Sequence, residues 1–455
     1  MTLEVVSEVL KSRRIKGWLV GGTVRDRELG RYSPDLDLVV AADAATAARE
    51  IARVLDAPWF ALSERHGACR VMARTGHVDV AALRGDGIAD DLAQRDFTVN
   101  AMAVPFEGGA IVDPFRGLAH LRQSRLVAVS QSIFRDDPLR LMRAPRFAHN
   151  LGLEPDAALV RAVQSEASLI VCAAGERVTT EMALTLSAGR SAEAVRRWRD
   201  LGLLEVVLPE VAADEKLAPA LALLERLDEL LSSPTEWFLT SRRSLTERLA
   251  TPVDGVMSRP VALRMAGLLH RSTVSENLGI ARRLKLSRPM HGLLQTVTGY
   301  FGGGPGRGLS VSPSGRPGVL FLWEVAPWEP EVIMLAAAGP AAPARENGSA
   351  ALGSSLECAR SLMGLWSERA AGRVSSPPLD GTVLMKELGL APGPLLGRLV
   401  REVRLAWEAG EVTSRDGLLA VARGTLEADR EEAGQEQEEE SPDTSGDSSG
   451  TRSAG

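Results

Sequence analysis

Apolar and polar positions change their spacing about one third of the way along the chain. Residues 18–40 combine apolar and β-branched runs around Gly21-Gly22, which predicts a strand, a glycine turn, a helix start and a second strand. Residues 44–56 carry apolar side chains three and four positions apart, which predicts a helix. Short apolar runs predict further strands at 69–73, 77–82, 98–104 and 110–113. The first 130 residues are therefore expected to be mixed α/β.

Helical spacing dominates from residue 137 onwards. Segments 156–170, 178–188 and 191–203 continue the pattern. Two stretches rich in Gly, Pro and Ser, at 302–317 and 339–355, interrupt it. We therefore expect a helical middle region, about 215–300, and a separate helical unit, about 356–425.

Composition limits the class of protein. A chain of 455 residues suggests roughly three or more domains of about 150 residues each, and 45% hydrophobic with 25% charged residues is an ordinary globular composition. No apolar run reaches the length of a bilayer span and the N-terminus lacks a signal-peptide core, so we expect a cytoplasmic protein without membrane contact. Cys69, Cys172 and Cys358 form no CxxC pair, which indicates neither a zinc site nor a disulfide framework.

The net charge of −6 is a weak argument against nucleic-acid binding, but the acidic residues are unevenly distributed. Residues 427–440 carry eight carboxylates, and the whole segment 427–455 is expected to be a disordered acidic tail. The remaining chain is then roughly neutral, which leaves room for a local basic face, for example across 135–199.

The strongest chemical pattern is a glycine pair followed by two aspartates. Asp35 and Asp37 are two apart on an expected strand, so their side chains point to the same side and can hold two Mg²⁺ ions for an in-line nucleotidyl transfer. Gly21 and Gly22 let backbone N–H groups approach phosphate oxygens, and Arg25 adds positive charge. Alone, an Asp-x-Asp is more often an exposed strand edge and a Gly-Gly a plain turn. When both occur together in one strand–loop–strand unit, they favour a catalytic site.

With these residues in place, the sequence resembles the class II tRNA nucleotidyltransferase (CCA-adding enzyme) and bacterial poly(A) polymerase family. Further motifs of that family occur in the right order at 91–102, 111–117, 136–147, 176–178 and 201–210. The similarity covers about residues 17–210. It implies an α+β fold, in which a polymerase-β-like nucleotidyltransferase head is followed by all-helical neck, body and tail domains.

The resemblance also implies domain bounds. The catalytic head is expected over 1–135, a neck with the nucleotide-selecting helix over 136–212, a body over 213–338 and a tail over 356–426. The tail is a candidate for RNA binding, because a Pro-Gly turn at 392–393 opening a helix exposes backbone N–H groups that can hold a phosphate. A plain helix–helix turn is the alternative.

The family's pattern assigns further residues of the head. Asp79 stands where the fold usually has a third carboxylate, which serves as a base or supports the metal site, and a purely structural role is equally expected. Arg95 is implied as a triphosphate or ribose contact, with Asp96 and Asn100 organising the site. Capping of a turn by Asp96 and a bend stabilised by Asn100 are the alternative roles.

Asp137 and Arg140 are implied as a protein template that selects the nucleotide. They are three apart, so they are expected on one helix face, where such a pair is ordinarily a weak surface ion pair. An Asp accepts from the exocyclic amino group of cytosine or adenine, and an Arg donates to ring acceptors. Arg143 and Arg146 continue the spacing towards the triphosphate, although Pro145 inside the helix is expected to kink it and re-aim Arg146.

The resulting hypothesis is a template-independent tRNA 3′-terminal nucleotidyltransferase. It would use Mg²⁺, CTP and ATP, with the 3′-hydroxyl attacking the α-phosphate and pyrophosphate leaving. Only six residues, 85–90, stand where many CCA-adding relatives have a longer flexible loop; in the family, loss of that loop accompanies addition of CC alone. CC-only or poly(A) addition therefore remain alternatives. A non-catalytic RNA-binding relative is a further alternative, against which Asp35 and Asp37 argue.

His270 lies where some relatives carry a His-Asp phosphohydrolase domain. No Asp follows it here, so we expect a packed or surface histidine and no metal phosphohydrolase activity.

Overall fold

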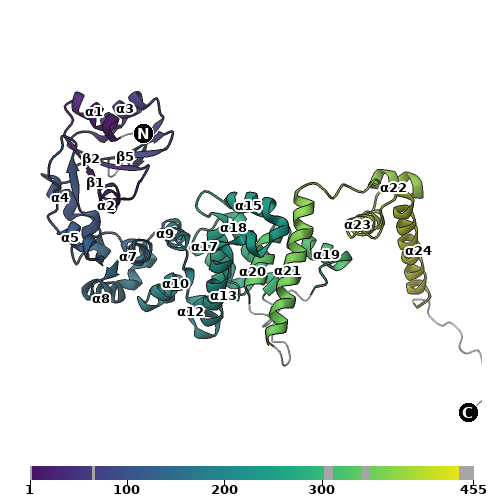
Figure 1. Cartoon of the computed structure of the whole chain (residues 1–455). Coiled ribbons are helices and arrows are strands. Elements are labelled where there is room, and N and C mark those ends of the chain that lie inside the picture. The colour runs from purple at the N-terminus through teal and green to yellow at the C-terminus, as the bar shows by residue number, and fades with distance from the viewer. Residues whose placement is uncertain (1–2, 64–66, 302–310, 340–347, 440–455) are drawn as a thin grey trace, which may run out of the picture. The chain divides into compact units, whose positions relative to one another are not determined.

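The computed structural model describes residues 3–63, 67–301, 311–339 and 348–439 (Figure 1). The chain forms two compact units, one of residues 1–228 with 252–298 and the other of 229–251 with 299–455. The body expected over 213–338 is thus divided between them. In the described residues, no helix combines the length and the apolar character needed to cross a membrane.

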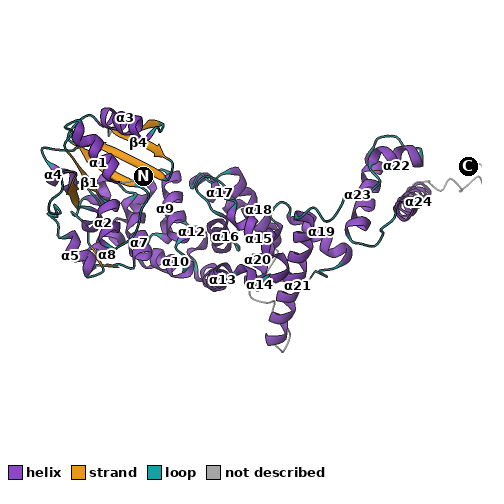
Figure 2. Ribbon diagram, turned by 45° about the horizontal axis from the view of Figure 1, so that its top comes forward, coloured by secondary structure: helices purple, strands orange, loops and turns teal. Residues whose placement is uncertain are grey.

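The first unit contains a six-stranded sheet (orange in Figure 2). Its strand order is β3-β4-β5-β2-β1-β6, and β2 and β5 are parallel while the other neighbours are antiparallel. The strands are β1 (Gly17–Val20), β2 (Leu36–Val40), β3 (Trp59–Ser63), β4 (Ala68–Ala73), β5 (Gly76–Ala82) and β6 (Ala103–Pro105).

Helices α1 (Leu3–Ser12) and α3 (Ala44–Leu55) lie over one face of this sheet (Figure 1). Helix α3 buries Ala44, Ala47, Ala48, Ile51 and Ala52, whose spacing of three and four places them on one stripe. Because side chains alternate along a strand, the residues of β5 that flank Asp79 are buried while Asp79 itself faces the other side. That other side carries the polar residues of the site.

Helices make up almost all of the remaining first unit. They are α2 (Gly22–Glu28), α4 (Ile88–Ala93), η1 (Thr98–Asn100), α5 (Gly117–Arg122), α6 (Ile133–Asp136), α7 (Arg140–Leu151), α8 (Ala157–Glu166), η2 (Ala167–Cys172), α9 (Gly175–Ser187), α10 (Ser191–Asp200), α11 (Leu204–Val207), α12 (Pro209–Ala212), α16 (Arg259–Leu268) and α17 (Val274–Arg283). A two-stranded ladder joins β7 (Arg125–Leu126) to β8 (Glu154–Pro155). Helices α13 (Asp214–Ser232) and α18 (Arg288–Phe301) contribute residues to both units.

The described residues of the second unit are helical. Its helices are α14 (Pro234–Trp237), η3 (Leu239–Ser241), α15 (Arg242–Ala250), α19 (Gly315–Val325), α20 (Glu329–Ala338), α21 (Gly348–Ala370), α22 (Gly381–Leu388), α23 (Pro394–Glu408) and α24 (Arg415–Glu439). The last three pack around a small apolar core that includes Leu384, Leu399, Val403, Leu418 and Ala422. The α+β fold with an N-terminal sheet and helical remainder is therefore confirmed.

Several local expectations differ from the structure. Residues 98–100 form a 3₁₀ turn before the short β6, and the run at 110–113 contributes only a bridge between Val112 and Ala103. Strand β3 was not expected, because Trp59–Ser63 shows no clear alternation. Residues 427–439, expected to be disordered, extend α24, since they are rich in the helix formers Glu, Gln and Ala. Residues 440–455 lie outside the described residues.

The expected breaks in the helical region are likewise only partly described. Segments 302–310 and 340–347 lie outside the described residues, whereas 348–355 belongs to α21.

Candidate active site

A cavity of about 540 Å³ opens on the polar side of the sheet, a volume within the range of small-molecule sites. Of the catalytic and nucleotide-binding residues expected from the sequence, all but Asp35 line it. They are Gly21, Gly22, Arg25, Asp37, Asp79, Arg95, Asp96, Asn100, Asp137, Arg140, Arg143 and Arg146. Strands, the glycine turn and the start of α7 thus bring together residues that lie more than a hundred positions apart.

The lining carries more positive than negative charge. Its arginines are Arg25, Arg84, Arg95, Arg140, Arg143 and Arg146, and its carboxylates are Asp37, Asp79, Asp96 and Asp137. Six cations against four anions leave an excess of two positive charges when all are ionised. A cavity with this balance suits a polyphosphate, because guanidinium groups bind phosphate oxygens in a fixed fork.

Two carboxylates face each other on neighbouring strands. Asp37 of β2 and Asp79 of β5 are direct partners in the parallel register. Burial raises the pKa of Asp37, and the charge of Asp79 raises it further, against the opposing effects of Arg95 and Arg25. The backbone N–H of Asp37 donates to the hydroxyl of Thr23 over 2.8 Å, so the glycine turn is tied to this strand. A cation placed here would relieve the repulsion between the two carboxylates.

Asp35 lies just before β2 and outside the cavity lining. Its carboxylate accepts from the backbone N–H of His77 over 3.0 Å and lies 2.8 Å from the ring Nδ1 of the same residue. The ring's Nε2 is 3.7 Å from the carboxylate of Asp79. The expectation that both aspartates lie on one strand holds for Asp37 alone, since β2 begins at Leu36, but Asp35 still reaches β5 through His77, two positions from Asp79. The two aspartates nevertheless have different surroundings.

Asp79 has a partner on its other side. Arg70 of β4 stands opposite it in the register and donates to it twice, from Nε over 2.7 Å and from Nη2 over 2.8 Å. This hydrogen bond raises the pKa of Arg70. Sequence reasoning missed Arg70 and His77, whose roles depend on strand pairing.

Backbone conformation and close neighbours require glycine at positions 21 and 22. Gly21 has a φ of 64°, in the left-handed region that favours glycine. A Cβ at Gly21 would lie 2.8 Å from Nη1 of Arg95, and one at Gly22 would lie 3.3 Å from a carboxylate oxygen of Asp37. Side chains at these positions would fill the space beside the Asp37 carboxylate.

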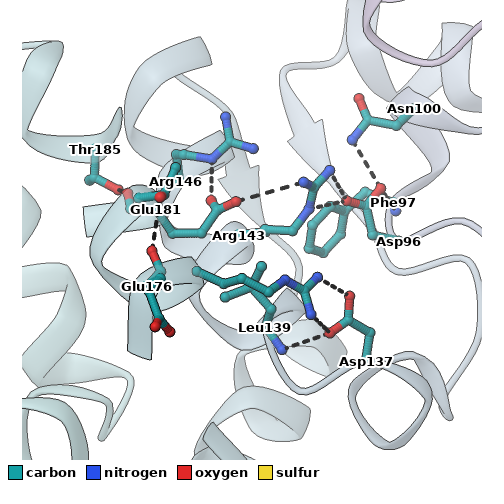
Figure 3. A network of polar contacts seen from close by, with 12 residues as sticks. Asp96, Phe97, Asn100, Asp137, Leu139, Arg143, Arg146, Glu176, Glu181 and Thr185 are labelled. Atoms are coloured by element: carbon teal, nitrogen blue, oxygen red, sulfur yellow. Dashed lines mark hydrogen bonds and ion pairs between the residues drawn. The ribbon is translucent and has the colours of Figure 1, made fainter. Parts of the chain in front are cut away.

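Where Asp96, Asn100 and α7 line the cavity, polar groups form a second wall with a connected network of contacts (Figure 3). Asp96 accepts from Nε of Arg143 over 2.7 Å, from the backbone N–H of Phe97 over 2.7 Å and from the amide of Asn100 over 3.0 Å. The carbonyl oxygen of the Asn100 side chain accepts from Arg25 over 2.6 Å. Burial alone would raise the pKa of Asp96, but the charge of Arg143 and these hydrogen bonds lower it. Asp96 and Asn100 therefore organise the arginines.

The network continues to a residue that the sequence did not single out. Glu181 of α9 is buried, pairs with Arg146 and lies 3.7 Å from Nη1 of Arg143 (Figure 3). The ring of Phe147 lies 4.2 Å from the Arg146 guanidinium and just over 5 Å from those of Arg25 and Arg143. Glu181 stands 35 positions after Arg146, so only the packing of α9 on α7 reveals it.

Asp137 and Arg140 do not share a helix face, contrary to the expectation. Helix α6 ends at Asp136, Asp137 is extended with a φ of −148°, and α7 begins at Arg140. The reason is Pro138, since the residue before a proline avoids helical angles. Both side chains still line the cavity.

Each member of this pair has its own partner. Asp137 accepts from Arg177 over 2.9 Å and from the backbone N–H of Leu139 over 3.2 Å, and Arg140 donates to the carbonyl of Gln94 over 2.7 Å. These contacts hold both side chains at the start of α7. Farther along, α7 continues through Pro145 to Leu151.

The short segment 85–90 is tied down at both ends. Asp91, which is almost fully buried, pairs with Arg84 at 2.8 Å and with Arg95 at 3.2 Å. The carboxylate of Asp90 accepts from the backbone N–H groups of Asp86 and Gly87. The segment is therefore a capped turn.

The carboxylates fit a divalent cation that a substrate helps to hold. The described residues contain no group of three or more His, Cys, Asp or Glu side chains able to enclose a metal ion. Mg²⁺ is commonly held by one or two carboxylates together with substrate phosphates and water. Asp37, with its raised pKa and Asp79 beside it, offers such a partial set.

His270 is unrelated to this cavity. It is buried after the end of α16, where its Nδ1 lies 2.7 Å from the carbonyl oxygen of Gly267.

Known proteins resemble this chain along most of its length. Residues 17–127 match the family model described as Poly A polymerase head domain, and 152–215 match the one described as probable RNA and SrmB-binding site of polymerase A. A CC-adding tRNA nucleotidyltransferase of Geobacter sulfurreducens is 29% identical, with 88% of this chain and 89% of that protein covered. An A-adding tRNA nucleotidyltransferase of Deinococcus radiodurans is 38% identical over 44% of this chain and 46% of its own length.

The fold has a counterpart among solved structures. The Thermotoga maritima CCA-adding enzyme complexed with tRNA_CCA superposes with a TM-score of 0.58 at 19% identity, covering 93% of this chain and 94% of that one. The two family models match the head and the helices after it in the order that the structure shows. The chain therefore belongs to the tRNA nucleotidyltransferase and poly(A) polymerase family of enzymes.

Proposed function

We propose that this protein is a template-independent tRNA 3′-terminal nucleotidyltransferase that adds C and A residues from CTP and ATP, depends on Mg²⁺ and releases pyrophosphate. The observation that carries the proposal is one cavity in which a repelling carboxylate pair faces a set of fixed arginines. The tRNA-processing relatives named above supply the substrate class.

The arginines and the glycine turn would bind the nucleoside triphosphate. Arg25, Arg143 and Arg146 are held by carboxylate and amide partners, so they would meet the phosphates without reorganising. Gly21 and Gly22 keep the space beside Asp37 open for a phosphate. These residues would orient the α-phosphate for attack by the 3′-hydroxyl of the RNA.

Asp37, with Asp35 or Asp79, would hold the Mg²⁺. When bound, the ion would lower the pKa of the attacking hydroxyl and neutralise charge on the triphosphate and the leaving pyrophosphate. The raised pKa of Asp37 supports this assignment, because a carboxylate that is costly to ionise alone gains most from a cation. For Asp79, release from Arg70 would free a carboxylate to take the proton of the 3′-hydroxyl.

Asp137 and Arg140 would select the base. Both line the same cavity as the arginines, and both are held at the start of α7 by contacts of their own. The Asp137 carboxylate would accept from the amino group that cytosine and adenine share, and Arg140 would donate to ring acceptors. Uracil lacks that donor, so no RNA template would be needed.

A part of the chain outside the cavity would hold the tRNA. We assign this role to the tail, 356–426, where Gly393 precedes the N-terminus of α23 and leaves the first N–H groups of that helix without a side-chain cap. A cytoplasmic site of action fits the three free cysteines among the described residues.

A second candidate is addition of CC alone. It is favoured by the capped turn at 85–90, where a flexible loop is absent, and by the CC-adding relative whose length this chain nearly covers. The similarity to the A-adding relative covers only 44% of this chain.

One assay tests the function and separates these candidates. A tRNA lacking CCA is incubated with the full chain, Mg²⁺ and CTP alone, ATP alone or both, and the 3′ ends are sequenced. The main proposal predicts CC with CTP and CCA with both nucleotides. Ends that stop at CC would leave only the second candidate, long A tracts would indicate poly(A) addition, and unchanged ends would contradict both.

A further inference from the structure

An apolar surface lies beside the catalytic carboxylates and has no role so far. It consists of Phe60 and Leu62 of β3 and Met72 of β4, which we call the apolar ledge. Their exposed fractions are 46%, 45% and 43%. Among residues 3–63 and 67–135, the other exposed large apolar side chains are Val5, Tyr32 and Val54, so half of that set of six gathers on two adjacent strands.

Strand pairing fixes which way the ledge faces. Phe60 stands opposite Arg70 in the β3–β4 register, and Arg70 stands opposite Asp79 in the β4–β5 register. Met72 is two positions from Arg70, so it shares the same face. The other face of these strands packs on α3 and buries Cys69 and Val71. The ledge is thus the outward continuation of the sheet face that carries the carboxylates.

The ledge is also continuous with the cavity. Leu62 and Ala68 line the cavity together with Asp79, and a register shift in β3 falls between Ala61 and Ser63. Arg70 lies between Phe60 and Asp79 with 31% of its side chain exposed. An apolar surface next to a guanidinium is the combination on which single-stranded nucleic acids stack their bases.

The in-line geometry of nucleotidyl transfer indicates which molecule would bind at the apolar ledge. An in-line displacement at phosphorus needs the attacking and leaving groups on opposite sides. The glycine turn follows β1, and Arg143 of α7 is linked through Asp96 and Asn100 to Arg25 of α2, so these phosphate-binding groups gather on the β1 side of Asp37. The attacking hydroxyl must then approach from the β5, β4 and β3 side, which is where the ledge lies.

We propose that the apolar ledge of Phe60, Leu62 and Met72 is the docking site for the 3′-terminal nucleobase of the RNA that is extended. The inference rests on the proposed function and names the subsite that positions the attacking end. Stacking there would hold the last ribose near Asp79. A second copy of the chain is the competing occupant, but three half-exposed side chains offer less than about 300 Å², against about 800 Å² per partner in a stable interface.

The test measures binding and extension separately. A 5′-labelled tRNA lacking CCA is titrated with the full chain, and the same RNA is prepared with an abasic 3′-terminal nucleotide that keeps its 3′-hydroxyl. For Phe60→Ala we expect about tenfold weaker binding and a similar rise in KM for the RNA, the typical loss of one base stack. The KM for CTP should stay within about twofold of the wild-type value, and Phe60→Trp should restore RNA binding.

Val54→Ala is the matched control. Val54 is 47% exposed, like Phe60, but lies on α3, which covers the other face of the sheet. Val54→Ala should change neither the affinity for the RNA nor the KM for the RNA. Removal of the 3′-terminal base should weaken binding to the wild type about tenfold and add little to the loss caused by Phe60→Ala, because both changes delete the same contact.

The outcomes separate this proposal from the proposed function. If removing the 3′-terminal base weakens RNA binding equally in the wild type and in Phe60→Ala, the ledge does not bind that base. This result would overturn the ledge proposal even if the wild type still extends the RNA. Loss of dimers on light scattering in Phe60→Ala would assign the ledge to a second copy and also overturn it. If the wild type extends no RNA, the proposed function fails. In that case the ledge proposal is tested by the binding titration alone. It is overturned if the wild type binds the intact and the abasic RNA ends equally well.

Discussion

The two walls of the cavity differ in how their charges are balanced. On the helical wall, Asp96 and Glu181 each contact arginines, and the pKa of Asp96 is lowered by its partners. On the sheet wall, Asp37 faces another carboxylate, and burial raises its pKa. The first wall is complete within the protein, whereas the second has an unbalanced negative charge. A prearranged wall can bind a ligand rigidly, and an unbalanced one indicates where a cation must enter.

The difference has a consequence for mutations. Changes on the helical wall break contacts that the folded protein already contains, so they should affect stability as well as binding. Changes on the sheet wall remove a charge that costs free energy in the folded state, so they should affect catalysis without loss of stability.

Asp37→Asn should have the largest effect. It removes the carboxylate that would hold the cation, so kcat should fall about a thousandfold or more. The free energy of unfolding should not decrease, because a partly buried carboxylate with a raised pKa is replaced by a neutral amide of the same shape. Single-turnover extension and urea unfolding measure the two quantities. A clear loss of stability would contradict the proposed contrast between the walls.

Glu181→Gln should come next, with its main effect on stability. Arg143 and Arg146 would lose their common carboxylate in a buried position, which typically costs about 3 kcal/mol. The KM for CTP should also rise, because the two guanidinium groups are no longer fixed. Glu193→Gln on the neighbouring α10 is the control, since Glu193 is 39% exposed and its pairs should contribute about 1 kcal/mol or less. Equal losses in both variants would be evidence against a fixed helical wall.

Asp137→Ala should alter selectivity more than rate. Its partner Arg177 is half exposed, so little stability is lost. Discrimination of CTP and ATP against UTP and GTP should fall about tenfold, the value of one specific base contact. Arg177→Ala tests whether the pair acts through Asp137 alone. Unchanged nucleotide choice in Asp137→Ala would remove the template assignment.

Thr23→Val should have the smallest effect. The variant keeps the side-chain shape but leaves the backbone N–H of Asp37 without its acceptor, which costs about 1 kcal/mol. We expect about a fivefold lower kcat, since the glycine turn is no longer tied to β2. A kcat equal to that of the wild type would show that this bond does not position Asp37.

Site residues that belong to local sequence motifs could be identified from the sequence. Site residues that only tertiary packing brings to the cavity could not. The glycine pair, Asp37 and the arginines of α7 were identified because they occur close together in recognisable patterns. Arg70 and Glu181 were missed, because strand register and the packing of α9 on α7 bring them to the site. Asp35 was grouped with Asp37 by spacing, yet its contact with His77 gives it different surroundings.

Local backbone effects account for other differences. Pro138 separates Asp137 from the helix that holds Arg140, a rule that the sequence alone could have supplied. Strand β3 has no alternating pattern because it lies at the sheet edge with both Phe60 and Leu62 exposed. The absence of a clear sequence pattern there coincides with the surface assigned to the RNA end.

The role of Asp37 in holding a catalytic divalent cation is tested by comparing the wild type with Asp37→Asn on one substrate. Both full chains are mixed in excess with a tRNA lacking CCA and saturating CTP, and cytidine incorporation is followed while Mg²⁺ is titrated from zero. We expect wild-type incorporation to rise with Mg²⁺ and to be abolished by a chelator, and Asp37→Asn to stay at background at every concentration. Incorporation by Asp37→Asn at the wild-type rate, or by the wild type without a divalent cation, would contradict this role.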